Sequence, residues 1–238
     1  MLFPQAWEEA SVRHASFIFT MTYTTQIINL LASLLLLIAF AMLSQRRILS
    51  LINLFAWQGL VLSLSTFVVA YSTDQHHLYY SAGLTLLLKV LVLPWLLHRL
   101  IRKLNVRWDV ETLINIPTTM LVGIVLVIFS FNLAAPISQL SESITRGLIG
   151  IALASVLLSL LMMLTRRKAV PQVVGFLAME NGLFFAATSA THGMPLVVEL
   201  GIALDVLVAT FIFGIFFFQI RETFDSLDIS HMEKLKDD

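Results

Sequence analysis

Long apolar stretches dominate this chain, and charged or polar residues mark where each one ends. Each stretch is about 20 residues long, which is the length that a helix needs to cross a bilayer. The pattern predicts an all-α fold, an integral membrane helical bundle with about seven transmembrane helices. The expected spans are residues 22–43, 48–71, 78–97, 113–133, 146–164, 170–190 and 196–220.

Composition supports a membrane protein. Of the 238 residues, 58% are hydrophobic and 13% are charged, whereas soluble domains carry roughly 25% charged residues. The mean hydropathy is +0.88. We therefore expect residues 1–238 to form a single membrane domain. The formal net charge is zero, which argues against a nucleic-acid partner.

The ends of the chain are the most polar parts. Residues 1–16 contain Glu8 and Glu9 and lack a basic region before a short apolar core, so we expect an amphipathic lead-in rather than a secretory signal peptide. Residues 222–238 are mixed in charge and are expected to form a cytoplasmic tail.

Basic clusters predict the orientation of the helices in the membrane. They follow the first, third and fifth spans, so all three fall on one side of the bilayer. The positive-inside rule assigns that side to the cytoplasm. The N-terminus is then expected outside and the C-terminus inside. The clusters are Arg46-Arg47, the segment with Arg99, Arg102, Lys103 and Arg107, and Arg166-Arg167-Lys168.

Residues 46–103 and 166–221 resemble each other and predict an internal repeat. Both units begin with Arg-Arg and cross the membrane twice. Because they begin on the same side, the repeat is parallel rather than inverted. The matched segments are LFAWQGL (54–60) with LAMENGL (177–183), and GLTLLLKVLV (83–92) with GIALDVLV (201–208). This pairing sets Lys89 opposite Asp205, Trp57 opposite Glu180, and Gln58 opposite Asn181.

Three ionisable residues, Lys89, Glu180 and Asp205, lie near the middle of expected spans. At 1.5 Å per residue each is about 15–20 Å from the nearest end of its helix, so the three are expected at one depth. A charged side chain at mid-bilayer costs about 2.5–3.5 kcal/mol on insertion scales. Such residues are expected to be paired, neutralised or part of an ion or proton path.

Two interpretations of these charges remain open. Lys89 could form a structural ion pair with Glu180 or Asp205. One lysine leaves one of two acids over, however, and that acid must be protonated, hydrated or partnered by another subunit. We therefore favour a proton relay through Glu180 and Asp205. Glu199 lies in the first turn after Pro195, where it either stabilises a helix N-terminus or joins the ion pairs.

Other polar residues in the spans have a simpler explanation. Gln26, Asn29 and Gln58 are expected to form interhelical hydrogen bonds, and Gln58 is also a candidate neighbour of the charges. The pair His76-His77 has no evident third ligand, so no metal site is expected. Cysteine is absent, which excludes disulfides and thiolate metal ligation within the chain. We expect no cofactor and no catalytic centre in this chain.

Two segments resemble a known family of proton-translocating subunits. VGFLAMENGLFF (174–185) followed by VELGIALDVLVATFIFGI (198–215) is similar to helices of the K subunit of respiratory complex I and of the C subunit of Mrp-type antiporters. Those proteins carry a mid-membrane carboxylate on each of two adjacent helices. By motif, Glu180 matches the first carboxylate and Asp205 the second.

A resemblance to hydrogenase-4 component E covers nearly the whole chain. It adds LLKVLVLPWLL (87–97) and LDISHMEKLK (227–236) to those motifs. It implies a membrane-arm subunit of a group 4 [NiFe]-hydrogenase or formate hydrogenlyase-like complex in the bacterial inner membrane. The partners would be antiporter-like and other membrane subunits, and the metal centres would belong to other subunits.

The first repeat unit departs from the K-subunit pattern, because Trp57-Gln58 and Lys89 replace carboxylates. The relay is therefore expected in the second unit, with Lys89 as its electrostatic modulator. The alternatives are a structural scaffold for antiporter-like subunits, a subunit of an Mrp-type cation/proton antiporter, and a stand-alone transporter with its own water pathway. The sequence leaves the coupling ion and the electron donor open.

Overall fold

The structure of the chain is a computed structural model. It describes residues 3–73, 76–103, 112–137 and 143–191, together with Gly201, Leu204, Leu207 and Val208. Within these ranges, side chains are described from Tyr23 onward, except those of residues 77, 103, 137, 143–146 and 189–191. Apart from Gly201, Leu204, Leu207 and Val208, the expected seventh span lies outside the described residues, as do the carboxylates Glu199 and Asp205 and the tail.

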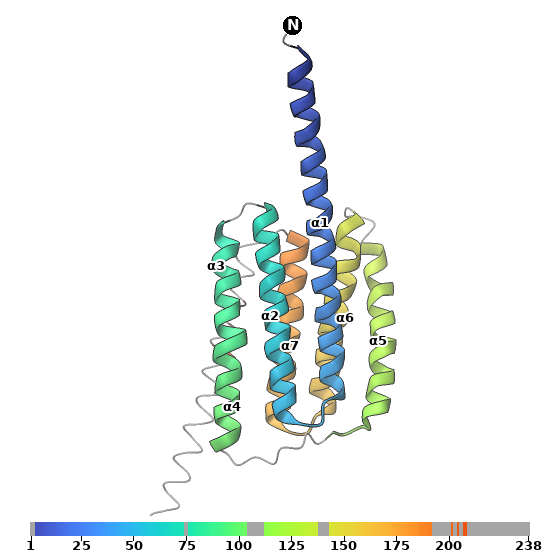
Figure 1. Cartoon of the computed structure of the whole chain (residues 1–238). Helices are drawn as coiled ribbons and strands as arrows, with labels where there is room; N and C mark the ends of the chain where they lie inside the picture. The colour runs from blue at the N-terminus through green and yellow to red at the C-terminus, as the bar shows by residue number, and fades with distance from the viewer. Residues whose placement is uncertain are drawn as a thin grey trace, which may run out of the picture.

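The described chain folds as an up-and-down bundle of helices (Figure 1). Among the described residues, six helical segments are long and apolar enough to cross a membrane, and they coincide with six of the expected spans. The helices are α1 (Phe3–Ser44), α2 (Ile48–Thr73), α3 (His76–Thr85), η1 (Leu86–Val92), α4 (Leu93–Lys103), α5 (Ile116–Ile137), α6 (Ser143–Thr165) and α7 (Ala169–Thr191).

The helices α1, α2, α6 and α7 form the centre of the bundle. α1 packs against α2 and α6, and α7 packs against α6 and α2. α5 lies beside α6 at one edge, and the segment α3–η1–α4 lies beside α2 at the other (Figure 1). The C-terminal ends of α1, α4 and α6 all lie at the bottom of Figure 1. We call this side the basic end of the bundle, because the described residues of the three predicted basic clusters lie there.

The third span is a single helical rod with a π-helix, η1, in its middle. A π-helix has i→i+5 hydrogen bonds and a wider turn than an α-helix, and it is rare. The backbone N–H of Leu93 closes this segment by donating to the carbonyl of Leu88. Pro94 follows directly and has no N–H to donate. The regular α-helical hydrogen bonds are therefore interrupted at this point, one turn after Lys89.

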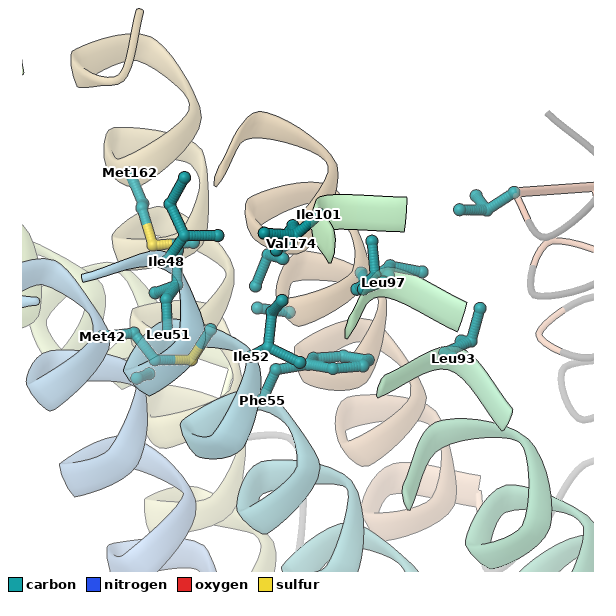
Figure 2. Packing of buried hydrophobic residues seen from close by; sticks show 14 of the residues in the cluster. Met42, Ile48, Leu51, Ile52, Phe55, Leu93, Leu97, Ile101, Met162 and Val174 are labelled. Atoms are coloured by element: carbon teal, nitrogen blue, oxygen red, sulfur yellow. The ribbon is translucent and has the colours of Figure 1, made fainter. Parts of the chain in front are cut away.

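Two apolar clusters fill the interior, one toward each end of the bundle. Figure 2 shows the cluster near the basic end, in which Ile52 and Phe55 of α2 lie beside Val174 of α7 and Leu97 of α4. The second cluster includes Leu62 of α2 and Phe185 of α7, further toward the other end. Both clusters have members on α2, α6 and α7. The residues of these helices between the two clusters are therefore at mid-depth.

Arg166 ties together several helices at the basic end. Its side chain is only 1% exposed, and its Nη2 donates to the backbone oxygens of Leu43 at 2.7 Å and Met42 at 3.4 Å. These carbonyls belong to the last turn of α1, where a cation is favourable because the helix dipole is negative. Gln172 of α7 in turn donates to the carbonyl of Arg166 at 2.9 Å.

The two arginines of the basic cluster 166–168 therefore play different parts. Arg166 is buried and joins helices, whereas Arg167 is exposed. Burial lowers the pKa of the Arg166 guanidinium from its usual value, although arginine remains protonated at any ordinary pH. A positive-inside count treats the two arginines alike, but only the exposed one faces the surroundings of the bundle.

We predict that Arg166→Met destabilises the chain by about 1–3 kcal/mol, because buried carbonyls of α1 lose their donor. Arg167→Met is the matched control, since an exposed substitution away from special contacts changes stability by less than about 0.5 kcal/mol. Thermal unfolding of both variants in one detergent measures the difference. Equal stability of the two variants would show that the Arg166 contacts do not hold α1 in place.

Candidate functional site

The centre of the candidate site is an ion pair between η1 and α7. Lys89 Nζ donates to Glu180 Oε1 at 2.8 Å. The Lys89 side chain is 2% exposed and that of Glu180 is 3% exposed. Of the two partners that the sequence left open for Lys89, the described structure brings Glu180 into contact. Asp205, the other, lies outside the described residues, so its position is not compared.

Phe184 and Gly201 also lie beside the ion pair. The Lys89 ammonium lies 5.5 Å from the centroid of the Phe184 ring, a distance at which a cation is attracted to an aromatic face. Phe184 and Glu180 are four residues apart on α7 and therefore share one face. At Gly201 a Cβ atom would lie 3.1 Å from Phe184 Cδ2 and 3.4 Å from Glu180 Oε1. Gly201 thus lies directly against the carboxylate.

A second polar contact joins α2 to α7 beside the ion pair. Asn181 Nδ2 donates to Gln58 Oε1 at 3.3 Å, and both side chains are fully buried. This confirms the interhelical hydrogen bond expected for Gln58. Gln26 and Asn29 differ from that expectation, because both face outward from α1 and neither side chain forms a hydrogen bond among the described residues.

These groups form a polar layer between the two apolar clusters. On α2, Gln58 lies between cluster members Phe55 and Val61. On α7, Glu180 and Asn181 lie between Ala178 and Phe184. On α6, Ser155 lies between Ala152 and Leu158 and is fully buried. We define the mid-bundle polar layer as Gln58, Lys89, Ser155, Glu180 and Asn181.

Several atoms in this layer have spare hydrogen-bonding capacity. Among the described residues, Gln58 Nε2, Ser155 Oγ, Glu180 Oε2 and Asn181 Oδ1 are buried without a hydrogen-bond partner. Exchanging the oxygen and nitrogen of both amides would only reverse the hydrogen bond and leave one donor and one acceptor unsatisfied, and exchanging them in one amide alone would break it. Leaving such a group without a partner in an apolar interior costs about 1–3 kcal/mol. The layer therefore offers free donors and acceptors to which a water molecule could bind.

Gly59 allows Lys89 to reach this layer. A Cβ atom at Gly59 would lie 3.0 Å from Lys89 Cβ and 3.3 Å from the Lys89 carbonyl oxygen. The backbones of α2 and η1 therefore approach more closely here than side chains on both would permit. Small residues play this part between transmembrane helices generally. The widened turn of η1 presents its backbone at the same point.

The sequence predicted the two described ionisable members of the site and missed much of what positions them. Lys89 and Glu180 were expected at one depth, and the structure brings them together. Ser155, Phe184 and Gly59 were not predicted, since a serine, a phenylalanine and a glycine are common in apolar helices. The one available signal was the QGL and NGL match of the repeat, which pairs Gln58 with Asn181 but does not say that they touch.

We predict that Gly59→Ala destabilises the chain by about 1–3 kcal/mol, because the new methyl group overpacks against Lys89. Gly83→Ala, in α3 of the third span, is the matched control, because no described neighbour lies within 4 Å of its added Cβ. Replacing that glycine should stabilise the helix by about 0.5–1 kcal/mol. Unfolding of both variants in detergent measures the contrast, and a stabilised Gly59→Ala variant would contradict the close approach.

Comparison with known proteins finds relatives whose sequences match most of this chain. The first is the "Uncharacterized protein Rv0085" of Mycobacterium tuberculosis, which is 31% identical over 212 residues, covering 89% of this chain and 96% of that protein. Hydrogenase-4 component E of Escherichia coli strain K12 is 25% identical over 214 residues, covering 89% of this chain and 98% of the relative. Hydrogenase-4 component E of Shigella flexneri matches to the same extent.

No family model matches the chain, and no solved structure is similar to it. The 25% identity with hydrogenase-4 component E confirms that resemblance as distant homology over most of the chain. That homology and the helical bundle fit a membrane subunit of a hydrogenase-type complex. By its identity and coverage, the chain belongs to the family of Rv0085 of Mycobacterium tuberculosis, with hydrogenase-4 component E as a more distant relative.

Proposed function

We propose that the chain is a membrane-arm subunit of a group 4 [NiFe]-hydrogenase or formate hydrogenlyase-like complex, and that it contributes mid-membrane carboxylates to a proton path. The distant homology to hydrogenase-4 component E supports the kind of complex. The observation that carries the proton path is the buried ion pair between Lys89 and Glu180 at 2.8 Å. Antiporter-like subunits of the bacterial inner membrane would be the neighbours that exchange protons with it.

The proposed mechanism follows from charge balance at Lys89. While Glu180 is ionised, the pair is neutral as a whole. If Glu180 takes up a proton, Lys89 becomes a buried charge that needs another anion, and leaving it uncompensated would cost several kcal/mol. Asp205 is the anion that we propose, since its motif accompanies Glu180 and it is expected at the same depth. Glu180 would then be protonated when Asp205 is ionised, and Asp205 would be protonated when Glu180 is ionised.

In this scheme Lys89 modulates the relay and carries no proton of its own along the path. Its ammonium favours one negative charge among the two carboxylates at any moment, so a proton that arrives at one releases a proton from the other. The spare acceptor Glu180 Oε2 and the neighbouring Gln58–Asn181 contact supply groups that can bind a bridging water. Glu199 would add a further carboxylate near the start of the seventh span, at the end away from the tail.

The second candidate function is a structural scaffold, and one observation favours it. The ion pair is almost fully enclosed and joins α7 to η1 between two apolar clusters, so it could serve only to fix two helices. A scaffold requires balanced charge at this point but no exchange of protons. The two functions therefore differ in what happens when both charges are removed together.

We predict that Lys89→Met alone reduces assembly of the complex, because it leaves the Glu180 carboxylate buried without its cation, a loss of about 3–5 kcal/mol. The double variant Lys89→Met with Glu180→Gln should assemble normally, since no charge remains unpaired. Blue-native electrophoresis of native membranes measures assembly in each variant.

Proton pumping by the assembled complexes then separates the two functions. A relay predicts that Glu180→Gln and the double variant assemble and still fail to pump when pumping is followed by a pH-sensitive dye in membrane vesicles. Normal pumping by the assembled double variant would exclude a path through Glu180 and leave the scaffold. Asp205→Asn tests the second carboxylate in the same assay and is expected to lose pumping as well.

A further inference from the structure

The outward face of α1 carries polar side chains where a lipid-facing helix should be apolar. Gln26, Asn29 and Ser33 all lie within the span Tyr23–Ser44 and are exposed. With about 100° of rotation per residue, the three fall on one strip along the helix. We call these residues the polar strip of α1.

The polar strip is only partly satisfied within the chain. Ser33 Oγ donates to the backbone oxygen of Asn29 at 2.9 Å. Across the part of the chain that the structure describes, the amide groups of Gln26 and Asn29 have no hydrogen-bond partner. Hydrocarbon offers neither donors nor acceptors, and each unsatisfied polar group there costs several kcal/mol. Lipid is therefore an unfavourable neighbour for this strip.

Asn132 on α5 shows that an outward-facing asparagine can find a hydrogen-bond partner within its own helix. It is also exposed, and its Nδ2 donates to the backbone oxygen of Ile128 one turn earlier, at 2.8 Å. Asn132 has thereby satisfied part of its amide within its own helix. Asn29 has the same side chain on a similar surface and makes no such contact among the described residues.

α1 is much longer than the bilayer is thick. It has 42 residues and is therefore about 63 Å long, roughly twice the 30 Å hydrocarbon core. Its first half extends past the ends of the other helices (Figure 1). The other described helices do not cover this half, which leaves α1 accessible to a neighbouring subunit there.

We propose that the polar strip of α1 binds a transmembrane helix of another subunit, one that presents serine, threonine, asparagine or glutamine side chains to Gln26 and Asn29. Interhelical hydrogen bonds of this kind hold membrane helices together. The inference rests on the proposed membership in a multi-subunit complex and not on the proton path. A second copy of this chain and a lipid are the competing occupants.

A photo-crosslinking amino acid at Leu30 tests the occupant. Leu30 is 62% exposed and lies beside Asn29 on the outward face. The full chain is expressed with its neighbouring subunits, and the crosslinked product is formed in native membranes and sequenced by mass spectrometry. The proposal requires a product with a transmembrane segment of a different subunit that contains these polar residues. A product of twice the mass of the chain, or one with lipid alone, overturns it.

The yield of the same crosslinked product tests whether Gln26 and Asn29 form hydrogen bonds with the partner. The double change Gln26→Leu with Asn29→Leu should lower the yield by about three- to tenfold, from the measured range for such bonds. Asn132→Leu is the matched control and should leave the yield unchanged. Equal yields in all variants, or an equal loss with Asn132→Leu, overturn the proposal. Proton pumping by the Glu180 variants is a separate readout, so failure of the proton path and failure of this contact are distinguishable.

Discussion

The interior of this bundle depends on one constraint, which is that the charge at mid-depth must stay balanced. Lys89 and Glu180 are 2.8 Å apart and almost fully buried, so neither can change its charge without a response from its surroundings. The neighbouring features serve that contact. Gly59 lets η1 approach α2, Phe184 lies near the ammonium, and Gly201 leaves room beside the carboxylate. Apolar clusters lie on both sides of it.

The parts of the fold that depend on the length of apolar runs could be predicted from the sequence. Six spans were confirmed because crossing hydrocarbon demands about 20 apolar residues whatever the helices touch. The depth of Lys89 and Glu180 could be predicted for the same reason, since rise per residue is constant. Depth alone does not say which acid meets the lysine, because helix rotation and the neighbouring helix decide that, and both depend on tertiary packing.

Other features could not be predicted because adjacent residues look alike in sequence. Arg166 and Arg167 are both basic residues at a helix end, yet one is buried under the last turn of α1 and the other is exposed. Likewise, Gln58 and Asn29 are both amides within apolar spans. Gln58 meets Asn181 inside the bundle, whereas Asn29 faces outward. The direction in which a side chain points is a property of packing and not of local pattern.

The π-helix η1 has a consequence for how the two halves of the chain compare. In the first unit five residues lie between Gly83 and Lys89, whereas three lie between Gly201 and Asp205 in the second. A helix can accept an inserted residue and keep its contacts on both sides only by widening a turn. The longer of the two matched segments is the one that contains η1, and the difference is two residues, of which a wider turn accommodates one. Any sequence comparison of the two predicted units therefore needs a gap of two residues at that turn.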